Sequence, residues 1–248
     1  MQSESEAFYL QPFNIQYILS MNYLKYLGHS CFQFSIGGKT IIIDPFIREN
    51  ALADGKVDVG NLEADFILLT HGHGDHVADA EELSLRNGAT IISNFEVANW
   101  FQDRGCTTFG MNTGGKNDFG FGEVRMVKAV HSSSLPDGSY GGNPTGFLIH
   151  ADGVTLYFAG DTALTKDMEL IPSFYHKPDL AILPVGGCFT MDYEDALIAS
   201  KLLQCDRVIG CHFNTFPPIS IDTVVAEELF AKNGKELILP EINQVINL

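Results

Sequence analysis

The sequence has few basic residues, few cysteines and no long apolar run, and each shortage excludes a class of protein. Lys and Arg number 15 against 31 Asp and Glu, which gives a formal net charge of −16. A surface this negative repels phosphate groups, so it does not favour binding to nucleic acid or to an anionic membrane. No apolar stretch approaches the ~20 residues that a membrane-spanning helix needs. A cleft can still become locally positive if it binds metal cations.

The cysteines and the start of the chain indicate a reducing compartment. The five cysteines are odd in number, scattered, and without a Cys-x-x-Cys pair. This arrangement is typical of free thiols and not of a disulfide framework. Lys25 is the first basic residue, so the chain begins without the positive segment of a secretory signal. We therefore expect a cytoplasmic protein.

The composition is sufficient for one large α/β domain. The 248 residues are 45% hydrophobic and 19% charged, which is typical of folded chains and not of disordered ones. Residues 1–20 begin polar and lack a clear period, so we expect an N-terminal arm or extension there, either loosely attached or forming an added helix or edge strand. Residues 21–248 are expected to form the main domain.

The hydrophobic pattern predicts two packed sheets with helices outside them. Phe32–Ile36 alternates, a Gly-Gly turn follows, and Thr40–Ile43 continues as a β-branched run, which together predict a hairpin. In the second half, strand patterns alternate with helical ones such as Tyr193–Leu203. Further strands are expected at 66–69, 90–92, 123–130, 147–150, 154–158, 180–185, 208–210 and, as the last, 237–239, with helices at 79–86, 96–104 and 221–232. This order fits two sheets in a layered α/β fold.

The strongest local signal is the segment Thr-His-Gly-His-Gly-Asp-His at residues 70–76. Three histidines and one aspartate lie within six residues, after a predicted buried strand and before a predicted helix. Alternation along an extended turn sends His71 and His73 to one side, and Asp75 and His76 follow where the helix begins. The two glycines allow the backbone to bend tightly. Imidazole and carboxylate groups that converge in this way are typical of zinc, manganese or iron sites.

Three more ligand-type residues come directly after predicted strands. His131 follows the strand that starts at residue 123, Asp161 follows the strand at 154–158, and His212 follows the strand at 208–210. Each residue alone is ordinary as a turn or capping residue. Together they place a ligand-type side chain at the end of each of three strands, which favours a shared metal site at one edge of the fold.

These seven residues, in this order and placement, resemble the ligand set of the metallo-β-lactamase superfamily from about Tyr23 to the C-terminus. The segments Leu-Gly-His-Ser, Ile-Asp-Pro-Phe, Gly-Met-Asn and Asn-Thr-Phe-Pro-Pro further resemble its uncharacterised metal-dependent hydrolase branch, which is related to the L-ascorbate-6-phosphate lactonases. The resemblance implies a four-layer αββα sandwich with the metals at one edge. It also implies a hydrolase that uses a metal-bridged hydroxide to cleave an ester, lactone or phosphodiester bond in a small molecule.

The resemblance implies two divalent metal ions and assigns each ligand. It places His71, His73 and His131 on the first ion, Asp75, His76 and His212 on the second, and Asp161 between both. Zinc is the first expectation, with manganese, iron or nickel as alternatives. A bound metal lowers the pKa of water to about 7, so the nucleophile exists at neutral pH. Asp75 and Asp161 are also catalytic candidates, and Asp75 is expected to orient the nucleophile or accept a proton.

Other residues near these segments have more than one interpretation. His29 is a catalytic candidate, either as a proton donor or substrate contact, or else a structural turn residue. Asp44 is expected to fix the tautomer of a ligand histidine, and Asn214 and Thr215 are candidate substrate contacts. Ser132–Ser134 are expected to form hydrogen bonds and not to act as nucleophiles. Cys188 lies where the branch tends to carry a polar residue, and we expect a buried thiol there.

Two other functions are compatible with the same fold. Relatives that use two irons to reduce oxygen carry Glu in place of His73 and an additional flavin domain, whereas this chain has His73 and 248 residues. A non-catalytic scaffold of this fold would have lost ligands, and here none is missing. We therefore expect a hydrolase whose partner is a small-molecule substrate, with no nucleic acid and no membrane, and we leave a homo-oligomer open.

Overall fold

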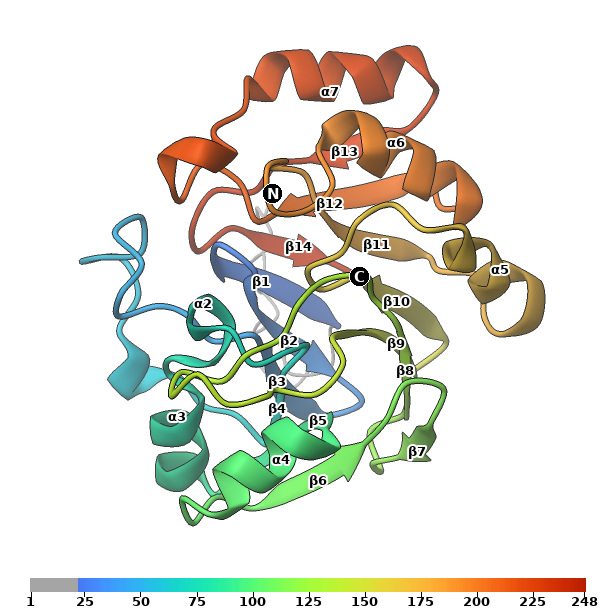
Figure 1. Cartoon of the computed structure of the whole chain (residues 1–248). Helices are drawn as coiled ribbons and strands as arrows, with labels where there is room; N and C mark the ends of the chain where they lie inside the picture. The colour runs from blue at the N-terminus through green and yellow to red at the C-terminus, as the bar shows by residue number, and fades with distance from the viewer. Residues whose placement is uncertain (1–21) are drawn as a thin grey trace, which may run out of the picture.

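The computed structural model describes residues 22–248, which form two seven-stranded sheets packed face to face, with helices on both outer sides (Figure 1). The expected αββα arrangement is therefore present. The N-terminal arm predicted at residues 1–20 lies outside the described residues. Within residues 22–248, no helix is both long enough and apolar enough to span a membrane.

The first sheet has the strand order β14-β1-β2-β3-β4-β5-β6. Its strands are β1 (Tyr23–Gly28), β2 (Cys31–Ile36), β3 (Lys39–Ile43), β4 (Phe66–Leu68), β5 (Thr90–Asn94), β6 (Thr108–Met111) and β14 (Val245–Asn247). The predicted hairpin is β2–β3, and β4, β5 and β6 then add in parallel. The crossovers contain helices α3 (Ala80–Asn87) and α4 (Phe95–Gln102), which cover the outer face of this sheet (Figure 1).

The second sheet has the strand order β13-β12-β11-β10-β9-β8-β7. Its strands are β7 (Lys116–Asp118), β8 (Glu123–Lys128), β9 (Thr145–Ala151), β10 (Val154–Phe158), β11 (Leu180–Pro184), β12 (Arg207–Cys211) and β13 (Glu236–Ile238). Strands β10 to β13 are parallel, so their carboxyl ends meet at one edge. Helices α5 (Leu170–Phe174), α6 (Tyr193–Leu202) and α7 (Thr223–Lys232) pack on the outer face.

Alternation along the strands builds the core between the sheets. In β2, Phe32 and Phe34 face inward and are buried, and the Phe32 ring meets Phe158 of the opposite sheet at a centroid distance of 6.0 Å. Full burial of an aromatic or aliphatic side chain stabilises a fold by about 1.5–3 kcal/mol. Because the two inner faces are almost wholly apolar, the polar ligand residues are confined to the edge where the strands end.

The helix ends follow ordinary capping chemistry. The predicted helix at 79–86 is α3, which ends at Gly88 in the left-handed conformation with φ +67°. Helices α6 and α7 begin after Asp192 and Asp222, whose carboxylates accept hydrogen bonds from backbone N–H groups of the first turn. Short 3₁₀ helices lie at Val59–Asn61, Lys166–Glu169 and Pro217–Ile219.

Three short strands were not predicted, and one prediction about chain order is wrong. Strand 237–239 appears as β13, but it is not the last, because β14 follows it and pairs antiparallel with β1. Strands β6 and β7 were also missed. β7 is polar and three residues long, and β14 is stabilised by a partner more than 200 residues away, so neither carries a strong local pattern.

Candidate metal centre

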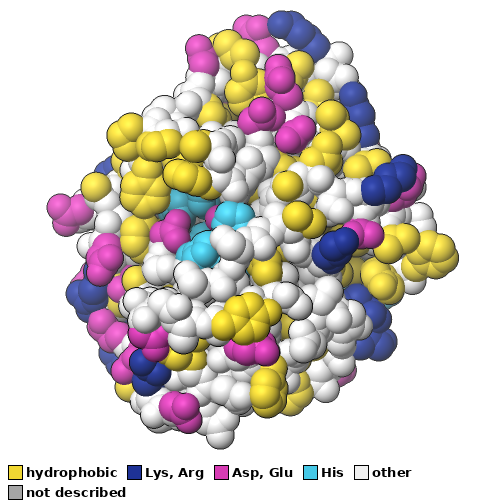
Figure 2. Space-filling model, viewed as in Figure 1, with side chains coloured by type: hydrophobic (Ala, Val, Ile, Leu, Met, Phe, Trp, Pro, Cys, Tyr) yellow, Lys and Arg dark blue, Asp and Glu magenta, His cyan; other side chains and the backbone are white. Residues whose placement is uncertain are grey.

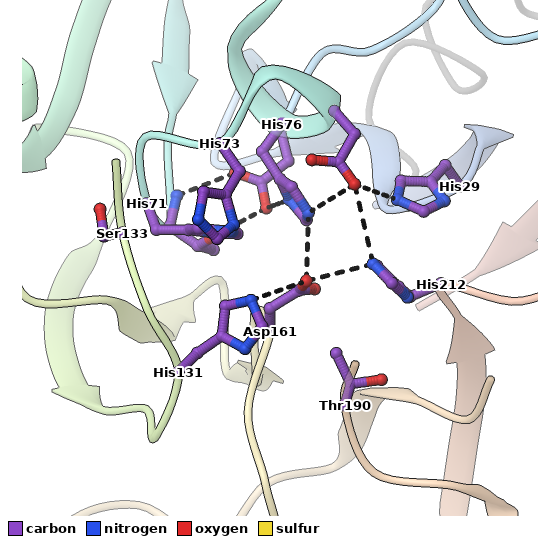
Figure 3. Close-up of polar contacts among 12 residues, drawn as sticks. His29, His71, His73, His76, His131, Ser133, Asp161, Thr190 and His212 are labelled. Carbon is purple, nitrogen blue, oxygen red and sulfur yellow. Dashed lines mark hydrogen bonds and ion pairs between the residues drawn. The ribbon is translucent and has the colours of Figure 1, made fainter. Parts of the chain in front are cut away.

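The segment between β4 and the short helix α2 (Gly74–Val77) forms one side of the centre (Figure 3). His71 leaves the strand buried, His73 occupies the N-cap position of α2, and Asp75 and His76 lie in the helix itself. Gly72 favours this close approach, because a Cβ atom at this position would lie only 3.0 Å from the carbonyl oxygen of Ser134. The tight turn therefore brings four ligand-type side chains together within six consecutive residues.

The other three predicted ligands come from the second sheet. His131 follows β8, Asp161 follows β10 and His212 follows β12, each just beyond the strand end. His212 has a left-handed backbone with φ +53°, and a Cβ atom on Gly186 would lie 2.1 Å from the His212 carbonyl oxygen. The close approach of these two loops aims the His212 ring at the same point as the β4–α2 segment (Figure 3).

The side chains fall into groups whose ligand atoms all lie within 4.8 Å of one another. These groups are His71, His73 and His131; His71, His76 and Asp161; and His29, Asp75, His76 and His212. Asp161 connects them, since its Oδ2 lies 3.1 Å from His212 Nε2, 3.4 Å from His76 Nε2 and 3.6 Å from His131 Nε2. The structure thus brings together all seven residues that the resemblance implied as ligands, and places His29 beside them.

Two buried atoms at the centre test whether a cation fits. His76 Nε2 and Asp161 Oδ1 are buried and have no hydrogen-bond partner among the described residues. A buried polar atom left unpaired costs about 1–3 kcal/mol, and more if it is charged. A divalent cation would satisfy both atoms, and imidazole with carboxylate is the donor set that zinc and its neighbours accept. The residues present therefore fit divalent metal ions.

Asp44, at the end of β3, supports two of the histidines from behind. Its Oδ2 accepts hydrogen bonds from His76 Nδ1 at 2.8 Å and from the Thr70 hydroxyl at 2.7 Å. Because the Thr70 proton goes to Asp44, Thr70 Oγ1 accepts the Nδ1–H of His71 at 3.0 Å. One buried carboxylate therefore fixes the tautomer of both histidines and turns each Nε2 toward the centre, where His71 Nε2 lies 2.9 Å from His73 Nδ1. The Ile-Asp-Pro pattern predicts this role for Asp44, whereas no sequence pattern indicates the part played by Thr70.

The protonation of the histidines differs across the centre. Burial lowers the pKa of one set below its ordinary value, and these are His71, His73 and His131. Burial also opposes the charged form of His76, but the neighbouring carboxylates Asp161 and Asp44 outweigh it and raise the pKa of His76 well above 6.5. Without a metal, His76 is therefore protonated, and its positive charge lies between the two carboxylates, where a cation would otherwise lie.

The carboxylates of the centre are ionised. Burial alone would raise the pKa of Asp75, but the hydrogen bond from His29 and the charge of His76 lower it below 3.8. Burial of Asp161 is likewise outweighed by His76 and His212, which hold its pKa well below 3.8. Both carboxylates therefore have the charge that a cation requires, without a proton to displace.

A pocket of about 290 Å³ opens above the centre. It is lined by His73, Asp75, His131, Ser132, Asp161, Phe189 and His212. In Figure 2 the histidines lie at the base of a hollow with hydrophobic side chains beside it. The Phe189 side chain is 55% exposed, and none of the described residues that line the pocket is Lys or Arg. The pocket therefore combines a polar base with an apolar rim.

The remaining candidates have clear positions. His29 is fully buried and contacts Asp75 and Thr215, so Thr215 faces His29. Burial lowers the pKa of His29 to about 4. Ser133 Oγ accepts the Gly72 N–H and donates to a backbone carbonyl, which is the hydrogen-bonding role expected for it.

The prediction of a buried Cys188 is wrong. Cys188 is exposed, in a turn beyond β11 where its own φ is +59° and the preceding Gly187 also has a positive φ. The two left-handed residues turn the chain away from the sheet, so the side chain leaves the sandwich instead of entering it. Cys211, within β12, is buried.

Comparison with known proteins defines the class. Residues 23–212 match the family described as Beta-lactamase superfamily domain. The solved structure of Igni18, a novel metallo hydrolase from the archaeon Ignicoccus hospitalis, superimposes with a TM-score of 0.83 at 34% identity, covering 92% of this chain and 99% of that one. An isothiocyanate hydrolase from Delia radicum gut bacteria shares the fold, with a TM-score of 0.75 at 19% identity. The fold is the metallo-β-lactamase fold.

The particular family follows from a closer relative. A protein of Christiangramia forsetii, named UPF0173 metal-dependent hydrolase, is 48% identical over 225 residues, which cover 91% of this chain and 99% of that protein. This chain therefore belongs to the UPF0173 family of the beta-lactamase superfamily.

Proposed function

We propose that this chain is a dinuclear metal-dependent hydrolase that cleaves an ester, lactone or phosphodiester bond in a small molecule. The observation that carries the proposal is the meeting of the ligand groups at Asp161, whose buried Oδ1 lacks a hydrogen-bond partner among residues 22–248. The family relatives named metal-dependent hydrolases support the same activity.

The proposed ligands are divided between two ions, with zinc as the first expectation and manganese, iron or nickel as alternatives. His71, His73 and His131 would hold one ion, Asp75, His76 and His212 the other, and Asp161 would contribute to both. When bound, two divalent cations supply the positive charge that activates water and polarises a carbonyl or phosphoryl oxygen.

The residues of the chain contribute orientation and proton transfer. Asp75 lies in the pocket wall with its side chain 29% exposed, so its ionised carboxylate is in position to orient an attacking water or accept its proton. Asp161 is buried at the base of the pocket and is in position to hold both ligand groups together. We propose Asp75 and Asp161 as catalytic residues on these grounds.

The pocket lining favours an acyl substrate over a phosphorylated one. The described lining residues include no Lys or Arg that would clamp a phosphate, and exposed Phe189 offers an apolar surface instead. We therefore propose an ester or lactone with an apolar group as the first candidate substrate. The free cysteines fit a reducing compartment, and we propose the cytoplasm.

The test is a substrate panel on protein of known metal content. The protein is stripped with a chelator, reloaded with zinc or manganese, and assayed with chromogenic esters, lactones and bis(p-nitrophenyl) phosphate. We expect up to two ions per chain and turnover of an ester or lactone that the chelator abolishes. The proposal fails if fully loaded protein hydrolyses none of the three classes, or if activity persists after complete metal removal.

A further inference from the structure

We infer that His29 is a positioning residue: oriented by Thr215, it holds the Asp75 carboxylate toward His76 and His212. This inference rests on the proposed metal-dependent function and adds a residue to it. It also decides between the roles open to His29, since a proton donor or substrate contact must reach the reacting atoms, whereas a positioning residue acts through a neighbour.

The surroundings of His29 place it behind the pocket wall. The side chain is fully buried, and His29 is absent from the described residues that line the pocket. Its ring lies 5.6 Å from Phe46, 5.5 Å from Phe216 and 4.2 Å from the His212 ring, measured between centroids. Aromatic rings therefore enclose the imidazole, and Asp75, which contacts His29 Nε2, lines the pocket in its place.

The chemistry of the two partners defines the tautomer of His29. His29 Nε2 lies 3.2 Å from Asp75 Oδ2, and because an ionised carboxylate can only accept, Nε2 carries the proton and donates it. The neutral ring then accepts at Nδ1, and Thr215 Oγ1 lies 2.9 Å from that atom, nearer than the 3.4 Å that separates it from the Phe213 carbonyl oxygen. Thr215 thus stabilises the tautomer with which His29 holds Asp75.

The backbone of His29 is fixed by the same neighbourhood. His29 has a left-handed backbone with φ +56°, and its carbonyl oxygen accepts the His212 N–H at 3.0 Å and the Tyr26 hydroxyl at 3.3 Å. A single turn after β1 therefore sets both the backbone of His212 and the carboxylate of Asp75. These residues come from three distant segments, and His29 is the contact common to all of them.

Among Asp75, His76 and His212, it is Asp75 that most needs a hydrogen bond to hold its side chain in place. Its side chain is 29% exposed, whereas those of His76 and His212 are at most 2% exposed. Asp75 Oδ2 lies 3.9 Å from His76 Nε2 and 3.9 Å from His212 Nε2, a separation that leaves room for a cation between them. Without the His29 N–H, this carboxylate is free to rotate toward solvent.

The test uses variants that keep or remove the donor, with metal affinity as the readout. His29→Gln retains an N–H near the position of Nε2, His29→Phe removes it at similar volume, and Thr215→Val removes only the hydroxyl behind it. His176→Phe, at an exposed histidine outside the centre, is the matched control. Each protein is checked for folding by thermal melting, stripped, and titrated with zinc by calorimetry. The cobalt-loaded forms are compared by electronic absorption, which reports ligand geometry.

We expect His29→Phe to bind the first ion normally and the second about 10- to 100-fold more weakly, as for removal of a residue that orients a ligand. His29→Gln should remain close to the unsubstituted protein, and Thr215→Val should weaken the second ion less than His29→Phe does. Unchanged affinity in His29→Phe overturns the inference, as does complete loss of one ion in both His29 variants, which would make His29 a ligand. If the unsubstituted protein binds no metal at all, it is the proposed function that fails.

Discussion

The two ligand groups share Asp161 but differ in burial and in what stands behind them. In the first group, His73 and His131 are partly exposed in the pocket wall. His71 is supported from behind through Thr70, whereas His73 contacts the His71 ring and, at 3.5 Å, the Ser132 hydroxyl of the pocket wall. In the second group, His76 and His212 are buried, and Asp44 and His29 hold its members from behind. The chain therefore fixes one half of the centre far more firmly than the other, which predicts two ions with different affinities and different responses to mutation.

Asp161→Asn has the largest expected effect, because this carboxylate is common to both halves. The amide removes negative charge beside His76, His131 and His212 while keeping the shape. Loss of several kcal/mol of transition-state stabilisation corresponds to a fall in kcat on the order of 10³-fold. The fold should survive, since the apolar core lies between the sheets.

The measurement is turnover of a substrate found in the panel, at matched metal occupancy, together with thermal melting. Asp206→Asn is the matched control, since Asp206 is exposed and pairs with Lys235 at the surface. Near-normal turnover in Asp161→Asn would contradict its role between the two ions.

Asp44→Asn should weaken both ions, whereas Thr70→Val should weaken only the first. Asp44 contacts His76 directly and His71 through the Thr70 hydroxyl, and Thr70→Val breaks only the second of these paths. Loss of an orienting residue lowers metal affinity about 10- to 100-fold. Breaking the buried network also lowers the free energy of unfolding by about 1–3 kcal/mol. Two-site calorimetric titration of both variants checks the asymmetry, and equal effects of the two on both ions would argue against this network.

The two halves should also release different numbers of protons when metal binds. Burial keeps the histidines of the first group neutral, whereas Asp161 and Asp44 raise the pKa of His76 well above 6.5 despite its burial. Filling the first group at pH 7 should therefore release almost no proton, and filling the second about one. Affinity for the second ion should fall first as the pH decreases, because His76 gains its proton at a higher pH than the histidines of the first group. Calorimetry in buffers of different ionisation enthalpy measures this, and proton release confined to the first ion would contradict it.

The sequence predicted the candidate ligands of both halves and the supporting Asp44, but not Thr70 or the pairing of His29 with Thr215, for a physical reason. The loop at residues 70–76 is a local pattern, and His131, Asp161 and His212 follow strands with strong apolar runs. The contact between His29 and Thr215 joins residues 186 positions apart, and no local pattern records it.

The fold shows the same limit. Long strands and capped helices such as α3 were predicted to within a few residues. The pairing of β14 with β1, which returns the chain end to the first sheet, depends on neighbours that only the folded chain brings together.

The smallest expected effect is that of Ser132→Ala, which separates a metal-dependent mechanism from a serine nucleophile. Ser132 lines the pocket, and its Oγ lies 3.5 Å from His73 Nε2, so a serine–histidine pair is geometrically conceivable. A serine mechanism needs that histidine free as a base, but His73 belongs to a proposed ligand group. We therefore expect kcat to change by less than about 3-fold, or under 1 kcal/mol of barrier, with full sensitivity to chelator retained.

Ser133→Ala is the control, and it should cost about 1 kcal/mol of stability because its hydroxyl holds the Gly72 turn. Loss of activity in Ser132→Ala with both ions still bound, or a covalent acyl-enzyme detected by mass spectrometry, would assign the chemistry to the serine.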